Sequence, residues 1–179
     1  GNPTPDSENN RHNVGFKIID AINKKFSLSK QKPKFKGLLT TGKIEGEKVY
    51  AIKPLTFMNN SGICIRELLE YFKFEAENVI VFHDDLDVEF GKIKAKFGGS
   101  SAGHNGIASI DKFIGKDYSR VRVGIGKPKT PIEIGDYVLQ NFDEDELVGI
   151  DKISNNIIES IGDLINKKLD LFSSTVNNK

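Results

Sequence analysis

The sequence predicts a single α/β domain over residues 1–179, built on a mixed, twisted β-sheet that is flanked by helices. Segments with helical apolar spacing alternate along the chain with strand-like segments, which is typical of this class. The run "VIVF" at residues 79–82 lacks polar alternation and therefore predicts a strand covered on both faces, as in parallel sheets. A length of 179 residues, with 37% hydrophobic and 28% charged residues, suits one globular domain with a substantial core.

The first half of the chain predicts two helices and a hairpin. Apolar residues at helical spacing run over residues 12–26, which indicates an amphipathic helix. The segments "GLLTTGKI" and "KVYAIKP" flank the turn "EGE" and predict a β-hairpin. The segment "SGICIRELLEYFKF" has a helical apolar pattern, and we expect Ser61 to cap its first turn.

The second half predicts two more strands and two more helices. The segment "KIKAKF" alternates cleanly, so it should form a half-exposed strand with Lys92, Lys94 and Lys96 on one face. A short helix is expected near residues 105–114, followed by the strand "RVRVGIG". Residues 143–168 predict the longest helix. The acids of "DEDE" lie in its first turn, where the helix dipole favours negative charge. The buried stripe of this helix should consist of Leu147, Ile150, Ile153, Ile157, Ile161 and Leu164.

Charge is distributed unevenly along the chain. The formal net charge is +1, and residues 1–91 carry 13 basic and 13 acidic groups. Residues 92–129 carry 9 Lys or Arg against 2 acids, hence +7, whereas residues 130–179 carry 4 against 10, hence −6. A basic middle in a nearly neutral chain indicates a local anionic partner, although a solvated charged face would give the same pattern.

Composition excludes several classes of protein. No apolar run approaches the roughly 20 residues that a membrane span needs, and no secretory signal is visible. The single Cys64 excludes an intramolecular disulfide framework and fits a reducing, cytosolic setting. Because the chain opens at Gly1 on the turn-like "GNPTPD", we expect that an amino-terminal piece is missing from the sequence.

Polar side chains gather at the end of the apolar strand, in "VIVFHDDLDVEF" at residues 79–90. In open α/β sheets functional groups collect beyond the carboxyl ends of strands. A metal site of His83, Asp84, Asp85 and Asp87 is possible in residue type, but alternate residues of a strand point to opposite faces. A solvated strand end accounts for Asp85 and Asp87, and His83 receives no role. Asp84 is the first carboxylate after a buried strand and should therefore have a partner.

The two other histidines each allow two interpretations. His12 lies at a predicted helix start, where it is either a capping-region residue or a base, since a helix start favours the neutral imidazole that accepts a proton. His104, in the glycine-rich "GGSSAGHNG", lies either at a simple loop-to-helix transition or where backbone N–H groups meet an anion or carbonyl. This loop is not G-x-S-x-G, and the chain has no phosphate-binding Walker or dinucleotide loop. Cys64 falls in an apolar helical pattern and is interpreted as a core residue.

The segment "KPLTFMNNSG" at residues 53–62 joins a predicted strand to a predicted helix. Helix capping by Asn60 or Ser61 would explain part of it. It would leave Phe57, Met58 and Asn59 without a role. An apolar rim beside an amide donor is what a site for an amide- or ester-bearing substrate would contain.

Six motifs in the same order and spacing resemble the bacterial-type peptidyl-tRNA hydrolases over essentially the whole chain. They are "GNP" at 1–3, "RHNVG" at 11–15, "KPLTFMNNSG" at 53–62, "HDDLD" at 83–87, "GHNGI" at 103–107 and "RVRVGIGKP" at 120–128. The resemblance implies a phosphorylase/hydrolase-like fold. It also implies an esterase, with no metal or cofactor, that releases peptides from peptidyl-tRNA and so recycles the tRNA.

The resemblance also implies roles for single residues. His12 matches the general base that activates water, and Asp84 matches the carboxylate that holds this base. Residues matching the substrate-binding positions are Asn2, Ser7, Phe57, Met58, Asn59, His104 and Asn105, with Asn59 and Asn105 able to donate to the ester carbonyl. Lys94 and Arg122 match residues that bind the 5′ phosphate of the tRNA, and both fall in the basic segment 92–129.

The family further implies a cytoplasmic monomer whose partner is the acceptor stem and 3′ end of peptidyl-tRNA. The chain departs from the family pattern in two places that concern the fold and the site. The apolar strand that precedes Gly-Asn-Pro is missing from the sequence, and Ser7 stands where the family has a Tyr near the peptide. Two other functions stay open: a non-catalytic RNA-binding relative, and an esterase or metallo-enzyme acting on small esters.

Overall fold

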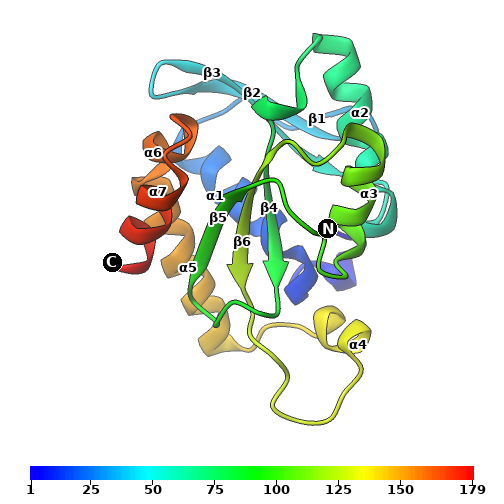
Figure 1. The fold of residues 1–179 in the computed structure, drawn as a ribbon, viewed down its shortest axis with the longest axis vertical. Helices are drawn as coiled ribbons and strands as arrows, with labels where there is room; N and C mark the ends of the chain where they lie inside the picture. Colours follow the sequence, from blue (N-terminus) through cyan, green and yellow to red (C-terminus); the bar gives the residue numbers. More distant parts are fainter.

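The structure, a computed structural model, describes residues 1–179, and its strands form two three-stranded sheets (Figure 1). The strands are β1 (Lys32–Lys34), β2 (Gly37–Ile44), β3 (Glu47–Pro54), β4 (Ile80–Asp85), β5 (Ile93–Phe97) and β6 (Ser119–Gly124). The sheet β1-β2-β3 is antiparallel. The sheet β4-β6-β5 is mixed, because β4 pairs parallel with β6 and β5 pairs antiparallel with β6. The α/β class is confirmed, with the strands divided between two sheets.

Helices surround both sheets. The α-helices are α1 (Val14–Lys25), α2 (Ser61–Phe72), α3 (Asn105–Ile114), α4 (Ile134–Leu139), α5 (Glu144–Glu159), α6 (Ile161–Ile165) and α7 (Leu169–Asn177), and the 3₁₀ turns are η1 (Pro5–Ser7), η2 (Arg11–Asn13), η3 (Met58–Asn60) and η4 (Ala76–Asn78). The helix predicted over 105–114 and the predicted hairpin are confirmed as α3 and β2–β3. No helix is both long and apolar enough to cross a membrane.

The helix predicted over residues 143–168 is wrong as a single element. It is divided at Ser160, where α5 ends and α6 begins. At this bend the Ser160 amide donates to Ile157 O and the Asp163 amide donates to Ser160 O, so the chain turns in 3₁₀ fashion. The acids of the first turn of α5 do form a capping box, in which Asp143 and Glu146 satisfy each other's backbone amides.

The capping role predicted for Ser61 is also wrong. Ser61 is the first residue of α2, and its hydroxyl donates to Met58 O at 2.8 Å instead of accepting from the helix. The turn η3 runs directly into α2, so its carbonyl groups take the place that a side-chain cap would have.

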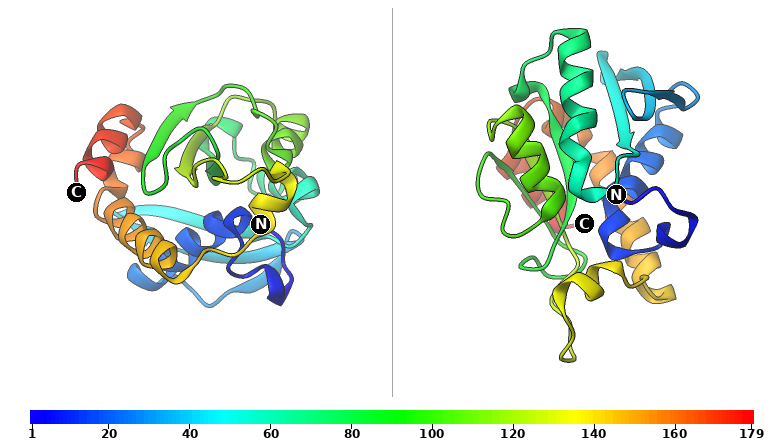
Figure 2. Two further views of the ribbon diagram at one scale, coloured as in Figure 1. Left: turned by 90° about the horizontal axis from the view of Figure 1, so that it is seen from below. Right: turned by 90° about the vertical axis from the view of Figure 1, so that its right-hand side faces the viewer.

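The main core lies between the mixed sheet and the helices α1, α5, α6 and α7. In Figure 1 the last three of these helices gather beside β5. A second, smaller core lies between the antiparallel sheet, α2 and α3, and the right-hand view of Figure 2 shows α2 and α3 side by side. A cavity of about 770 Å³ is lined by residues of β3 and β4 and reaches His12, Asp84 and His104.

Candidate active site

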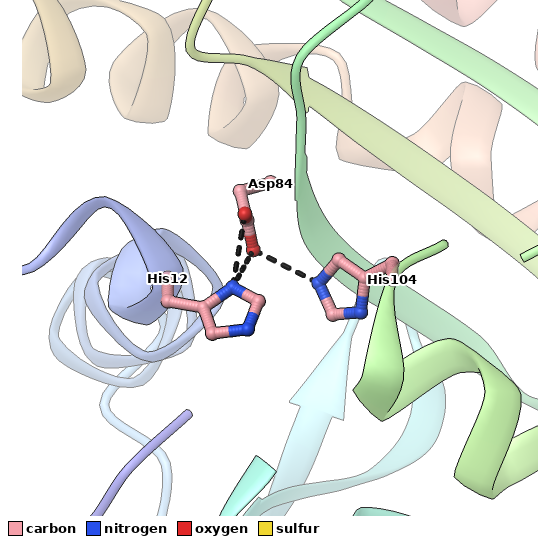
Figure 3. Close-up of side chains that lie close together, drawn as sticks. All are labelled: His12, Asp84 and His104. Atoms are coloured by element: carbon pink, nitrogen blue, oxygen red, sulfur yellow. Dashed lines mark hydrogen bonds and ion pairs between the residues drawn. The ribbon is translucent and has the colours of Figure 1, made fainter. Parts of the chain in front are cut away.

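Two histidines from separate parts of the chain converge on Asp84, which lies near the carboxyl end of β4 (Figure 3). His12 Nδ1 lies 2.8 Å from Asp84 Oδ1 and 2.9 Å from Oδ2. His104 Nε2 lies 2.9 Å from Asp84 Oδ1. The side chain of Asp84 is only 3% exposed, and those of both histidines are 10% exposed. The partner that Asp84 was expected to have is therefore a pair of imidazoles.

Hydrogen bonding fixes which nitrogen of each neutral imidazole carries the proton. His104 Nδ1 accepts from the Ile107 amide at 3.2 Å, because His104 is the N-cap of α3. Its Nε2–H must then donate to Asp84. His12 likewise donates Nδ1–H to Asp84, which leaves its Nε2 with a free lone pair. A free Nε2 is the atom that can remove a proton from water.

The surroundings of Asp84 keep it ionised. Burial by itself would raise the pKa of its carboxyl, but the charge and hydrogen bond of His104, together with the hydrogen bond and charge of His12, hold the pKa below its ordinary value. A carboxylate between two imidazole N–H groups favours a positive charge on either ring. The arrangement can therefore stabilise an imidazolium that forms during a reaction.

The same three residues offer nitrogen and oxygen atoms that all lie within 4.8 Å of one another, which is a possible metal-ligand set. Three hydrogen bonds already occupy His12 Nδ1 and both nitrogens of His104. A metal bound by these atoms would have to displace those hydrogen bonds. The donor set therefore fits an acid–base centre better than a metal centre.

Gly15 explains how the chain brings His12 to Asp84. A Cβ atom added at Gly15 would lie 2.4 Å from the carbonyl oxygen of Phe82, so only glycine allows the start of α1 to contact the backbone of β4. The turn η2, which carries His12, immediately precedes this contact. The glycine of the "RHNVG" motif is thus needed for the distance between His12 and Asp84.

A second network holds Asn2 beside the site. Asn13 Oδ1 accepts from the Asn2 amide at 2.7 Å, and Asn13 Nδ2 donates to Asn2 O at 2.9 Å. Asn2 Oδ1 in turn accepts from the Met58 amide at 3.0 Å. Because Oδ1 is already used, Asn2 Nδ2 is the group left to meet a ligand, and it can only donate. The role of Asn13 was missed, although it lies in the "RHNVG" motif.

The segment from Phe57 to Asn59 combines an exposed ring, a buried thioether and an exposed amide. Phe57 is 53% exposed and has a φ of +60°, an uncommon conformation for a residue with a side chain. Met58 is buried and lines the cavity that reaches His12. The side chains of Asn59 and Asn105 are exposed and make no hydrogen bond within the chain, so both amides are free to bind a ligand.

Ser7 belongs to the turn η1, and its side chain is hydrogen-bonded within that turn. It is buried in η1, and its hydroxyl shares a hydrogen bond of 2.7 Å with the hydroxyl of Thr4. The hydroxyl of Ser7 is therefore used within the amino-terminal turn, and its role in substrate binding stays a prediction.

The basic candidates lie on the neighbouring strands of the mixed sheet. Arg122 on β6 is opposite Lys94 on β5 in the antiparallel register, and Lys94 is exposed. Arg122 Nε donates to Asp85 Oδ2 at 2.7 Å. Burial of Asp85 opposes its ionisation, but the hydrogen bond from Arg122 holds the pKa of this carboxyl below its ordinary value. The solvated strand end predicted for Asp85 is therefore wrong, whereas Asp87 is exposed as expected.

Lys96 belongs to the same basic face and was missed as a candidate. Burial and the positive charges of Arg122 and Arg120 lower the pKa of its ammonium group. Like charges held together in this way are a common feature of anion sites, because a bound anion relieves the repulsion. The alternation of "KIKAKF", which puts Lys94 and Lys96 on one face, was the available signal.

His83, left without a role by the sequence, is a buried neighbour of the site. Its Nδ1–H donates to Asp84 O at 2.8 Å, and its ring lies 5.0 Å from that of His104. Its Nε2 is buried and has no partner. Burial, followed by the charge of His104, lowers the pKa of His83 from 6.5 to about 4.

This shift predicts a loss of stability in acid. The unfolded chain takes up a proton at His83 as the pH falls through 6.5, whereas the folded chain resists until about 4. Stability should therefore be fully present above pH 6.5 and decrease between pH 6.5 and 4, by on the order of 3 kcal/mol. The free energy of unfolding, measured with urea at a series of pH values, should depend less steeply on pH in His83→Phe than in the parent. The same pH dependence of the unfolding free energy in both proteins would show that His83 is not its source.

Comparisons with known proteins agree over the whole chain. The sequence profile of the family described as "Peptidyl-tRNA hydrolase" matches residues 1–179. A peptidyl-tRNA hydrolase of Pelagibacter ubique is 78% identical over 179 residues, which is 100% of this chain and 96% of that protein. One of Ehrlichia canis is 43% identical over 178 residues, 99% of this chain and 91% of that protein.

Solved structures give the same result. The crystal structure of peptidyl-tRNA hydrolase from Acinetobacter baumannii has a TM-score of 0.91 and 29% sequence identity, and the match covers 99% of this chain and 91% of that one. A family profile that matches from the first residue to the last, together with a relative at 78% identity, identifies the family. This chain belongs to the peptidyl-tRNA hydrolase family.

Proposed function

We propose that this chain hydrolyses the ester bond between the peptide, or an N-blocked amino acid, and the tRNA in peptidyl-tRNA, with His12 as general base. The observation that carries the proposal is the pair of hydrogen bonds at 2.8 and 2.9 Å between His12 Nδ1 and the carboxylate of Asp84, which leaves His12 Nε2 free. Its physiological result is the recycling of tRNA from stalled or aborted translation.

In the proposed mechanism His12 Nε2 removes a proton from a water molecule as the water oxygen attacks the ester carbonyl carbon. The positive charge on His12 is stabilised by Asp84. When the tetrahedral intermediate collapses, the bond to the ribose oxygen breaks and this oxygen takes the proton from His12. The products are a tRNA with a free ribose hydroxyl and a peptide carboxylic acid, which loses its proton to solvent to become the carboxylate.

Two exposed amides are proposed to stabilise the intermediate. Asn59 lies in the turn that leads into α2, Asn105 is the first residue of α3, and neither side chain is used by a hydrogen bond within the chain. Each can donate an N–H to the oxygen that becomes negatively charged. Phe57 and Met58 would form the apolar rim that contacts the peptide.

Asn2 is proposed to select substrates with a blocked amino terminus. Its Nδ2 is the free group and can only donate, because its Oδ1 accepts from the Met58 amide. A donor fits the carbonyl of a peptide or N-acyl group and does not fit the ammonium of an unblocked amino acid. The side chain of Asn13 is hydrogen-bonded to both the amide and the carbonyl of Asn2, which supports this orientation.

The basic face is proposed to bind the 5′ phosphate at the end of the acceptor stem. Arg122 is held by Asp85, which directly follows Asp84 on β4, so the same strand supports the phosphate site and the acid–base centre. Lys94 and Lys96 extend from the adjacent strand. Contacts of this kind fix the register of a nucleic acid without reading its sequence.

Replacing Lys94, Lys96 or Arg122 with alanine should raise KM for a peptidyl-tRNA substrate about tenfold while kcat changes little, because the lost contact is with a remote phosphate. Short ester mimics without the acceptor stem should be hydrolysed as by the parent. Steady-state kinetics on both substrates checks this, with Lys112→Ala, exposed on α3, as a control for general charge. An equal effect on both substrates would rule out the phosphate site.

The proposed reaction has consequences for cofactor use and assembly. It needs neither metal nor cofactor, and we propose that the enzyme acts as a monomer in the cytoplasm, where translation takes place. Light scattering in solution, which gives the molar mass directly, checks the monomer.

One assay tests the proposed function as a whole. It measures the release of N-acetyl-amino acid from acylated tRNA, with and without a chelator, in the parent. Release that is insensitive to chelator supports the proposal. Loss of release with chelator would favour a metal at His12, Asp84 and His104, and tight tRNA binding without release would favour a non-catalytic RNA-binding protein.

A further inference from the structure

Arg11, the residue before the proposed base, is a buried arginine with a fixed set of partners. Only 8% of it is exposed. Its NH2 group donates to both carboxylate oxygens of Glu146, at 2.7 and 2.9 Å. Its NH1 group donates to Asn141 O at 2.8 Å and to Gln140 O at 3.3 Å. One side chain in η2 therefore binds the end of α4 and the first turn of α5 together.

Two aromatic rings lie against this guanidinium group. Its Cζ atom lies 4.6 Å from the ring centre of Tyr137 and 5.4 Å from that of Phe142. Tyr137 is itself held, because its hydroxyl donates to Ile125 O at 3.0 Å, directly after β6. Stacking between a guanidinium group and aromatic rings is specific to arginine, since lysine has no planar fork.

Glu146 is equally constrained. Besides binding Arg11, its Oε2 accepts from the Asp143 amide in the capping box that begins α5. The carboxylate therefore has a fixed position relative to a sixteen-residue helix. Both charges are largely buried, at 10% and 22% side-chain exposure, so loss of one would leave the other without its partner.

The backbone around Arg11 makes few hydrogen bonds to residues 140–142. The Arg11 amide donates to Gln140 O at 3.0 Å, and the Phe142 amide donates to Asn9 O at 2.9 Å. These bonds form one isolated bridge, between Asn10 and Asn141, and no extended ladder. His12 follows this bridge and must meet Asp84, which belongs to a different element, within hydrogen-bond distance.

We propose that Arg11 is a positioning residue for His12, acting through its bidentate pair with Glu146 and its contacts with residues 140–142. This inference rests on the proposed function. It assigns Arg11 no contact with substrate: it holds η2 so that the His12 ring keeps its hydrogen bonds to Asp84 and directs Nε2 to the substrate. Displacement of a reacting group by about 1 Å can lower a rate roughly 100-fold.

The experiment compares the parent with Arg11→Ala, Arg11→Lys and Glu146→Gln on N-acetyl-aminoacyl-tRNA. We expect kcat to fall roughly 10- to 100-fold in Arg11→Ala, with KM within about twofold of the parent. Arg11→Lys should recover only part of kcat, because one ammonium nitrogen cannot replace the separate NH1 contacts with residues 140 and 141 or the planar group that lies against the two rings. Arg66→Ala, which removes an exposed arginine paired with Glu70, is the matched control and should behave as the parent.

Chemical rescue separates positioning from a general loss of structure. Guanidinium chloride at a few tens of millimolar should restore much of kcat to Arg11→Ala, because the small cation can occupy the vacated site between Glu146 and the two rings. Sodium chloride at the same ionic strength should not. If Arg11→Ala does not fold, Glu146→Gln and Arg11→Lys provide the kcat and KM values.

Three results would overturn the inference. They are an unchanged kcat in all three variants, a change confined to KM, and a loss of kcat that follows thermal stability without any rescue by guanidinium. Failure of the proposed function is distinguishable, since it would leave the parent itself without release of the N-acetyl-amino acid.

Discussion

Replacing His12 with alanine should lower kcat for peptidyl-tRNA hydrolysis about 1,000-fold or more, the upper part of the range for loss of a general base. Without the imidazole no group at this position can take a proton from water, because Asp84 is held as a carboxylate behind the ring and His104 already uses both of its nitrogens. KM should change little, since the proposed phosphate and peptide contacts would remain. Single-turnover hydrolysis of N-acetyl-aminoacyl-tRNA measures the effect.

The control for this variant is Lys24→Ala, which removes an exposed polar side chain near the carboxyl end of α1, away from the helix start that carries the site. Added imidazole should restore part of the activity of His12→Ala, because the vacated space lies beside a carboxylate that can orient it. Parent-like turnover in His12→Ala would refute the general base. The chain would still belong to the family, but another residue would have to activate water.

Local patterns predicted those parts of the fold that are decided locally. The bounds of α3 follow from a glycine-rich start, an apolar stripe and Gly115 directly after the last residue, where φ is +79°. The break at Ser160 has no such signal: the apolar stripe continues through Ile161 and Leu164, both buried in the same core as α5. The division of the strands into two sheets depends on contacts far apart in the chain, which periodicity does not contain.

The site shows the same limit. Asp84 could be selected as a buried carboxylate in need of a partner, but its partners lie 72 residues before it and 20 residues after it. The resemblance to a family supplied His12, whereas the hydrogen bond from His104 needed the structure. Asp85 was misinterpreted because its partner Arg122 lies on another strand, 37 residues away.

Replacing Asp84 with asparagine should lower kcat by about 1,000- to 10,000-fold, with a small effect on KM, through the tautomer of His12. His104 keeps its proton on Nε2, because its Nδ1 accepts from the Ile107 amide. It therefore orients the new amide with its oxygen at the Oδ1 position, which places the NH2 group at the Oδ2 position, 2.9 Å from His12 Nδ1. An NH2 group can only donate, so it favours the tautomer in which His12 accepts at Nδ1 and carries its proton on Nε2. The base then has no lone pair directed at water.

The double variant with His104→Ala should recover activity that Asp84→Asn alone has lost. Removing His104 should let the amide at position 84 turn its oxygen toward His12 Nδ1–H and restore the useful tautomer. The double variant should then be about tenfold more active than Asp84→Asn alone, although His104→Ala by itself should reduce activity. Single-turnover rates of the parent, both single variants and the double variant form the cycle that measures this coupling. If the two losses simply multiply, His104 does not set the orientation of the amide at position 84, and the effect of the asparagine would have to come from lost charge alone.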